Sequence, residues 1–363
     1  MNVRSAGKAL RVLVLLGVFA LAAACPAWGA APSATSAEIA PPRVVETSPT
    51  RGEELAIDGA IRLVFDRPMD RASVESAVGI APEVAGRWEW TSDTTVQFTP
   101  SQPWERDAVY TVSVAATARD GNGIQLADPF SLRLHAVGFL TVTQVIPVDG
   151  ATGIAADSSI TVLFNRPVVA LSAVSAPGIA PLPDPLVFEP AVAGTGEWLN
   201  TSIYVFTPSP PLLGGTEYTV TVRAGLSDTT GGLLASDVVW RFTTVRPEVV
   251  WTSPRDGDER VSLTESLRVT FNMPISLDSA RERLSMREVS AFGLWTSPVA
   301  GTLSADGNDL VFEPAAPLAF NRHVVVTLEP GVVAQAGGLG TTDFIRFRFR
   351  TVPTLRILGT TPR

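Results

Sequence analysis

Apolar and polar residues alternate along three stretches of the chain that share one motif. The stretches are LVFDRPMD from Leu63, VLFNRPVV from Val162 and VTFNMPIS from Val269. In the first and third, apolar residues occupy every second position up to the Phe, which predicts a strand with one buried face. The motif then continues through Asp or Asn to Pro. Because Asp and Asn hydrogen-bond their own backbone in turns, and Pro cannot donate to a ladder, each strand is expected to leave its sheet there.

The motif recurs at the spacing of whole domains. Its aromatic residues, Phe65, Phe164 and Phe271, lie 99 and 107 residues apart. Solenoid and propeller repeats have periods of roughly 20 to 50 residues, whereas a period of about 100 residues is the size of one independent domain. The 363-residue chain is therefore expected to hold three similar domains, over residues 42–138, 139–245 and 246–352.

Three other blocks repeat with the motif in every unit. The first is an opening strand that ends at a proline, at Pro49, Pro147 and Pro254. The second is a strand that ends in Phe-Thr-Pro or Phe-Glu-Pro, at Phe98, Phe206 and Phe312. The third is an alternating strand twelve residues after that Phe, at Tyr110, Tyr218 and Val324. About seven strands per unit, with turn signals every 8 to 12 residues, predict tandem seven-stranded antiparallel sandwiches of immunoglobulin type, an all-β fold. Helical spacing is confined to residues 278–289, which we expect to be a short insertion in the third unit.

The repeated blocks resemble a known domain family. In the second unit they are FNRP, FTP, PLLGGTEYTVTV and WRFTT, beginning at Phe164, Phe206, Pro211 and Trp240. This combination is similar to the bacterial Ig-like domain first recognised in the S-layer protein SbsA. The first unit departs from the pattern at Leu134-His-Ala, and the third lacks the family's Tyr at Val324. The resemblance implies a spacer or binding module, without catalysis, in an exported protein.

The resemblance also points to bacterial alpha-2-macroglobulin-like protease traps, some of which carry such domains near the N-terminus. Residues 353–363 are similar to the openings of the first and third units, at Pro42 and Pro247, so they are expected to begin a truncated fourth domain. Three functions stay open. The first is a rod of Ig-like domains in the cell envelope or on the cell surface that acts as a spacer or binding scaffold. The second is the N-terminal fragment of a protease trap, and the weakest is a carbohydrate-binding adhesin.

The N-terminus predicts export. Residues 1–29 combine three basic residues with an apolar run of 13 residues, 12–24, which is too short to span a bilayer as a helix and is typical of a signal peptide. Cys25, the single cysteine, follows Leu-Ala-Ala-Ala. That setting resembles a lipoprotein box, which would make Cys25 a lipidation site. Ordinary cleavage near Gly29 would instead discard it. Residues 30–41, rich in Ala, Ser, Thr and Pro, are expected to be a linker.

Charge limits the partners. The first 37 residues hold three bases and no acid, so their removal takes the formal net charge from −8 to about −11. Such a chain would repel phosphates, which argues against nucleic acid as a partner. A lipid anchor at Cys25 is then the one expected contact with a membrane. The expected partners are other envelope or surface components, polysaccharide or protein.

Catalysis has little support in the sequence. The two histidines, His135 and His323, fall in different units, and no thiol follows residue 25, so neither a nucleophile with its base nor a thioester is expected.

Short acidic segments are weak candidates for calcium. Asp120 and Asn122, Asp256 and Asp258, and the segment 306–309 have the alternating oxygen spacing that begins a Ca²⁺ loop, although none continues with the closing Glu of an EF-hand. Asp, Asn and Gly are also the residues of tight turns, and we expect turns rather than a metal cofactor.

Two tryptophans are candidates for ligand stacking. Trp88 and Trp90 are two residues apart, so they share one face of a strand and could stack on a sugar if that face were exposed. Packing in the core of the sandwich is the alternative.

Overall fold

The computed structural model describes residues 40–175, 182–289 and 296–355. Strands dominate these residues, and only three short helices interrupt them. The expected signal segment 1–29 with Cys25, nearly all of the linker 30–41, and residues 356–363 lie outside the described part. In the described part, no helix is long and apolar enough to cross a membrane.

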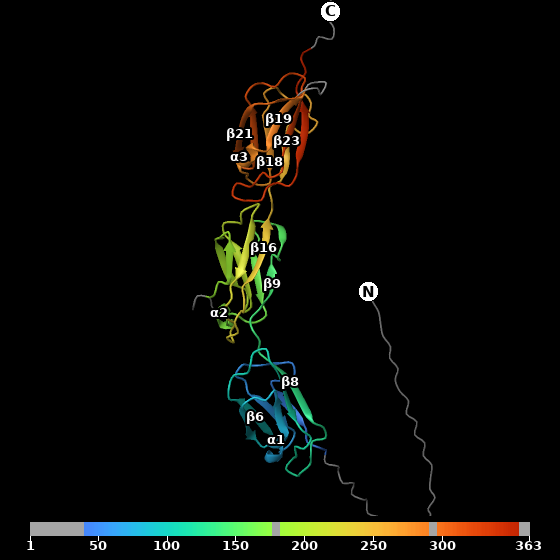
Figure 1. The fold of residues 1–363 in the computed structure, drawn as a ribbon, viewed down its shortest axis with the longest axis vertical. Coiled ribbons are helices and arrows are strands. Elements are labelled where there is room, and N and C mark those ends of the chain that lie inside the picture. Colours follow the sequence, from blue (N-terminus) through green and yellow to red (C-terminus); the bar gives the residue numbers. More distant parts are fainter. Residues whose placement is uncertain (1–39, 176–181, 290–295, 356–363) are drawn as a thin grey trace, which may run out of the picture.

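Three β-sandwiches stand end to end along the chain (Figure 1). Each contains eight strands in two four-stranded sheets, which confirms the all-β class and the tandem Ig-like sandwiches. Sandwich 1 consists of β1 (Val44–Ser48), β2 (Glu54–Leu55), β3 (Ile61–Phe65), β4 (Val78–Ala81), β5 (Gly86–Ser92), β6 (Thr95–Pro100), β7 (Val109–Val114) and β8 (Phe130–Ala136). Sandwich 2 consists of β9 (Val142–Ile146), β10 (Ala151–Ile154), β11 (Ile160–Phe164), β12 (Leu186–Glu189), β13 (Gly194–Trp198), β14 (Ile203–Pro208), β15 (Glu217–Val222) and β16 (Val238–Thr244). Sandwich 3 consists of β17 (Val249–Ser253), β18 (Leu267–Phe271), β19 (Leu284–Val289), β20 (Thr296–Pro298), β21 (Gly301–Asp306), β22 (Asp309–Pro314), β23 (His323–Leu328) and β24 (Ile345–Arg350).

The eighth strand of the first two sandwiches comes from division of the opening strand. β1 pairs antiparallel with β3, and after Pro49 the chain crosses to the other sheet, where β2 pairs parallel with β8. β9 and β10 divide in the same way. In sandwich 3 the crossing is a single parallel bridge between Val261 and Thr351, and β20 is the eighth strand, at the edge beside β19.

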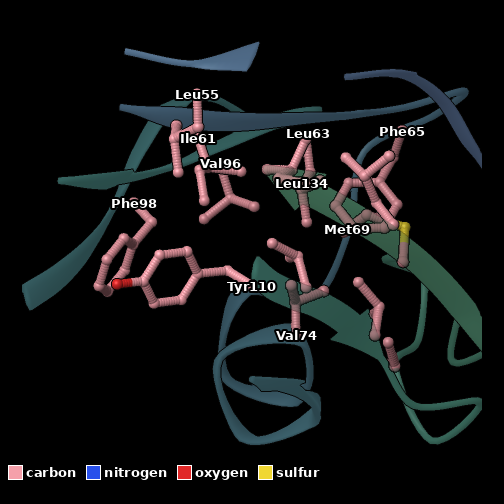
Figure 2. Close-up of a cluster of buried hydrophobic side chains, with 14 of the residues drawn as sticks. Leu55, Ile61, Leu63, Phe65, Met69, Val74, Val96, Phe98, Tyr110 and Leu134 are labelled. Carbon is pink, nitrogen blue, oxygen red and sulfur yellow. The ribbon is translucent and has the colours of Figure 1, made fainter. Parts of the chain in front are cut away.

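The motif strands β3, β11 and β18 are central in their sheets. Every second residue of β3 and of β18 is buried, as the alternation predicted. Phe65, Phe164 and Phe271 at their ends are 2%, 5% and 1% exposed. Figure 2 shows the core of sandwich 1, where side chains of both sheets meet above a short helix. Burial of these apolar faces is the main stabilising term for each sandwich.

The expected insertion over 278–289 is wrong. α3 (Leu277–Arg281) ends early, and β19 follows it and pairs with β23 over six residues. Pairing with β23 outweighs the local helical spacing of that segment. α1 (Arg71–Ala77) and α2 (Leu171–Ser175) occupy the same place after the motif in sandwiches 1 and 2. The helix is thus part of every unit.

Candidate functional site

The Asn of the motif binds the linker between two sandwiches. Asn165 Oδ1 accepts the N–H of Thr141 at 2.8 Å, and its Nδ2 donates to the carbonyl of Phe139 at 3.1 Å. Asn272 makes the same two bonds to the chain just before β17, at 2.9 and 3.0 Å. Asp66 in sandwich 1 accepts the N–H of Arg43 at 3.2 Å but has no amide to donate. The motif therefore fixes the path of the chain into each sandwich.

The next residue of the motif contacts the preceding sandwich at the first of two joints. Joint 1 is formed by Glu54, Arg106 and Gly138 on the side of sandwich 1 and by Arg166 and Thr230 of sandwich 2. The guanidinium of Arg166 binds both carboxylate oxygens of Glu54, at 2.7 and 2.6 Å. The Arg166 side chain is 15% exposed and that of Glu54 52%. Hydrogen bonds from Arg166 lower the pKa of Glu54, against the raising effect of burial. A bidentate pair of this kind fixes orientation as well as distance.

A second arginine crosses joint 1 in the opposite direction. Arg106 of sandwich 1 donates to the carbonyl of Gly138 at 3.0 Å, and to the Oγ1 of Thr230 at 3.3 Å and its carbonyl. Asp228 holds the turn that presents Thr230, because its Oδ1 accepts the N–H of Thr230 and of Gly232. Two arginines therefore bind sandwiches 1 and 2 together from opposite sides.

Joint 2 uses backbone and apolar contacts in place of ion pairs. It is formed by Gly214, Gly215 and Arg246 on the side of sandwich 2 and by Met273, Leu339 and Gly340 of sandwich 3. The N–H of Leu339 donates to the carbonyl of Gly215 at 2.7 Å. Met273 lies against Gly214, where an added Cβ would come within 2.6 Å of the sulfur. Arg246 donates to the carbonyl of Gly340 at 3.5 Å.

The two joints use equivalent positions of the repeat. Arg166 and Met273 both follow the Asn of the motif. Arg106 and Gly214 both precede a residue with left-handed backbone, Asp107 at φ 62° and Gly215 at φ 59°. Equivalent positions of the repeat therefore form an ion pair and side-chain hydrogen bonds at joint 1, and close backbone packing at joint 2.

The calcium candidates of the first unit hold a turn. Asp120 is 1% exposed, and its Oδ1 accepts the N–H of Asn122 and of Ile124, each at 2.9 Å. Its Oδ2 is buried without a hydrogen-bond partner and lies 3.7 Å from Arg67 Nη1. The carboxylate is thus already engaged by backbone N–H groups and a cation.

The other calcium candidates are engaged in the same way. Asp256 Oδ1 accepts the N–H of Arg348 at 3.0 Å, and Asp258 Oδ2 accepts that of Arg255 at 2.8 Å. Residues 306–309 form the turn of the β21–β22 hairpin. Among the described residues, no group of three or more His, Cys, Asp and Glu side chains is placed to hold a metal ion.

Trp88 and Trp90 share one face of β5, and that face points toward the core. Both are partly buried and pack against the core of sandwich 1. Trp88 lies 5.1 Å from the ring of Phe98. Trp90 donates through Nε1 to Glu75 at 3.0 Å, and the guanidinium of Arg71 lies 5.7 Å from its ring centroid. Both side chains thus make the contacts that the packing alternative describes.

The two histidines lie far from one another. His135 is on β8 in sandwich 1, and His323 begins β23 in sandwich 3. Among the described residues, no Ser, Thr or Cys side chain lies at hydrogen-bond distance from either histidine side chain. The sequence analysis did not predict the joints. One signal could have indicated them: the residue that follows the Asn or Asp of the motif is Arg67 or Arg166 in the first two units but Met273 in the third.

Comparison with known proteins agrees with the repeat. The model of the bacterial Ig-like domain family matches the chain three times, over residues 38–141, 137–244 and 245–351. No curated protein matches the chain.

Solved structures give only distant likenesses. They include the L,D-transpeptidase LdtMt1 in complex with imipenem, at 20% identity over 34% of this chain and 49% of that chain, TM-score 0.21. The FN1-FN3 domains of chicken CNTN1 align at 14% identity over 86% and 99%, TM-score 0.24. The N-terminal part of the bacterial S-layer protein SbsC aligns at 13% identity over 56% and 44%, TM-score 0.23. This chain thus covers about half the length of the transpeptidase chain.

Proposed function

The chain belongs to the bacterial Ig-like domain family, and from that premise we propose that it is a non-catalytic protein of the cell envelope or cell surface. In this proposal its three sandwiches form a stiff rod that spaces or presents a binding surface for other envelope components, polysaccharide or protein. Export rests on the signal-like residues 1–29. The exported protein then has two alternatives, a lipid anchor on Cys25 or release in soluble form.

One observation carries the proposal, namely that each pair of neighbouring sandwiches is bound by contacts beyond the covalent linker. At joint 1 these are the bidentate pair of Arg166 with Glu54 and the bonds from Arg106 to Thr230. At joint 2 the N–H of Leu339 bonds to the carbonyl of Gly215. Together with the amide of the motif Asn, which holds each linker, such contacts restrict bending that a bare linker would allow.

The other two functions lack a supporting observation. The adhesin requires an open face on Trp88 and Trp90, and both pack against the core. The protease trap stays a prediction from the resemblance alone.

Small-angle X-ray scattering tests the rod. We expect the dilute protein to give the distance distribution of one elongated shape. The double variant Arg106→Ala with Arg166→Ala should give a broader distribution, because joint 1 then bends. The matched control is Arg62→Ala with Arg71→Ala, which removes two arginines from exposed ion pairs within sandwich 1. A wild-type protein that fits only an ensemble of bent shapes, or a control that broadens equally, would refute the rod.

Localisation has a separate test. The intact mass of the mature protein should be measured after separation of membrane and soluble fractions of the native host. A mass that begins at Cys25 with added acyl chains, in the membrane fraction, supports the anchored rod. A soluble product that begins near Ala30 supports the released form, and a product retained in the cytoplasm contradicts both.

A further inference from the structure

The outer face of one sheet in sandwich 3 is cationic. In the sheet β20-β19-β23-β24, of which β19 and β23 are labelled in Figure 1, the arginines of β24 alternate with buried Phe347 and Phe349 and therefore point outward. Strand pairing places the outward residues of β19, β23 and β24 in three rows, which are Ser285, Thr327 and Arg346, then Arg287, Val325 and Arg348, then Val289, His323 and Arg350. We call these nine residues the cationic face, and none of them is acidic.

The four arginines of the cationic face have no carboxylate partner among the described residues. Arg287, Arg346 and Arg348 are exposed, and Arg350 donates to the amide oxygen of Asn321 at 3.1 and 2.7 Å. The ion pairs in the described part of sandwich 3 join other residues, namely Arg268 with Asp309, Arg281 with Asp278 and Arg283 with Glu282. The positive charge of the face is thus not neutralised by ion pairs within the described part of the sandwich.

Two neighbouring carboxylates lie off the face. Glu288 alternates with Arg287 along β19, and its Oε1 accepts the N–H of Ala319 at 2.8 Å on the inner side of the strand. Asp256 lies at the edge of the sheet, where its Oδ1 accepts the N–H of Arg348 at 3.0 Å. Both carboxylates are therefore engaged by backbone N–H groups beside the face, and the guanidinium groups are left to bind an outside anion.

The equivalent faces of the other two sandwiches are not cationic. The four arginine positions are occupied in sandwich 1 by Ala81, Ser131, Arg133 and His135, and in sandwich 2 by Glu189, Val239, Arg241 and Thr243. Because all three sandwiches form the same sheet, the fold does not require the additional arginines. Like charges on one face repel each other and oppose folding. A cluster that the fold neither needs nor neutralises indicates a binding role.

The cationic face lies along the side of the rod. The joints are at the ends of the sandwiches (Figure 1), and they leave the equivalent faces of sandwiches 1 and 2 open, where Arg133 and Arg241 are exposed. A sandwich stacked in the same way on sandwich 3 would therefore leave the cationic face open as well.

We propose that the cationic face binds an acidic polysaccharide of the envelope, whose repeating units carry carboxylate or phosphate groups. A planar guanidinium binds either anion through two parallel N–H groups. The three arginines of β24 follow one another at about 7 Å along the strand, so they can bind successive anionic groups of a linear polymer. The hydroxyls of Ser285 and Thr327, on the same face, can bond to sugar hydroxyls.

The composition of the face favours a polysaccharide over other anionic surfaces. Protein interfaces have aromatic or large aliphatic anchors at their centre, and peripheral membrane binding needs apolar side chains that enter the lipid interface. The apolar residues of the cationic face are only Val289 and Val325. This inference rests on the proposed function, because it names the envelope component that the rod binds. It does not depend on the stiffness of the rod, which scattering tests separately.

Biolayer interferometry on immobilised polysaccharides tests the binding. Polygalacturonate presents carboxylates, a phosphomannan presents phosphates, and dextran is the neutral control. We expect the wild-type protein to bind at least one acidic polymer and not dextran, and to bind more weakly as salt is raised, because exposed ion pairs are screened. Arg346→Gln with Arg348→Gln should weaken binding at least about tenfold. The matched control, Arg268→Gln with Arg281→Gln, removes the same charge from exposed ion pairs of sandwich 3 and should change binding less than about twofold.

Three results of this assay would overturn the proposal. They are binding to neither acidic polymer, binding to dextran as tight as to the acidic polymers, and an equal loss in the control variant. Vesicles of phosphatidylglycerol and phosphatidylcholine are a further arm. Binding to these vesicles that is as tight as to the polysaccharides and is lost in Arg346→Gln with Arg348→Gln would assign the face to a membrane surface instead.

Arginine footprinting locates the contact in the unaltered protein. Phenylglyoxal modifies exposed arginines, and peptide mass spectrometry measures the rate at each one. The bound acidic polymer should slow modification of Arg346 and Arg348. It should leave unchanged Arg133 and Arg241, which are exposed at the position of Arg348 in sandwiches 1 and 2. Equal protection of all four arginines, or no protection at saturating polymer, contradicts binding at the cationic face.

Discussion

A partly buried backbone amide at the edge of sandwich 2 depends on one tyrosine hydroxyl. Tyr218 is 2% exposed, and its hydroxyl accepts the N–H of Leu213, five residues upstream, at 2.9 Å. Burial raises the pKa of Tyr218, so the hydroxyl stays neutral at physiological pH. The arrangement is similar to the tyrosine corner of immunoglobulin-type sandwiches. Tyr218→Phe keeps the ring and its stacking on Phe242 but leaves the Leu213 amide without its acceptor.

We expect Tyr218→Phe to lower the free energy of unfolding of sandwich 2 by about 1 kcal/mol, because a partly buried donor that loses its acceptor costs less than a fully buried one. Because the chain holds three sandwiches, one melting temperature does not describe it, and hydrogen exchange resolved by peptide is the suitable assay. Exchange through global opening of sandwich 2 should become roughly 5-fold faster. Sandwiches 1 and 3 are internal controls. A change below about 0.5 kcal/mol in sandwich 2 would refute the reasoning, since that is the scatter of neutral surface substitutions.

Sandwich 3 satisfies the equivalent amide in another way. Val324 stands at the position of Tyr218 and has no hydroxyl, and the N–H of Ala319, five residues upstream, donates to Glu288 Oε1 at 2.8 Å. Glu288→Ala should therefore speed exchange in sandwich 3, by about the same factor or more because hydrogen bonds to charged groups are stronger. Glu288→Gln keeps an acceptor and should have the smaller effect.

Three further outcomes are expected. Because hydrogen bonds from Arg166 lower the pKa of Glu54, the ion pair contributes fully above the ordinary carboxyl pKa and is lost as pH falls through the lowered value. Scattering should therefore show joint 1 loosening only below about pH 4.5, and Glu54→Gln should remove that pH dependence. Gly196→Ala should destabilise sandwich 2 by about 1 to 3 kcal/mol, because the added Cβ would overlap the Tyr204 hydroxyl; unchanged exchange there would contradict the packing. Calcium or a chelator should leave unfolding unchanged, since the Asp120 carboxylate already accepts two backbone N–H groups; a calcium-dependent shift would revive the metal site.

The sequence by itself determined the strands and their repetition. Alternation with a period of two is a local property that two faces of a pleated strand impose, so the motif strands ending at Phe65, Phe164 and Phe271 could be placed without any partner. The spacing of those strands then separated three units, and the repeated blocks pointed to the family. The prediction of a short helical insertion over residues 278–289 failed because the strand that pairs with this segment, β23, lies elsewhere in the chain.

Only the tertiary structure decided what joins the sandwiches. Arg166 and Glu54 are 112 residues apart, and nothing in either local segment indicates that they meet. Glu288 takes over the role of a missing tyrosine because strand pairing brings it to Ala319, 31 residues away. Contacts of this kind depend on how whole sandwiches fold and stack. Side-chain periodicity specifies which face of a strand is buried, but not which distant group lies opposite it.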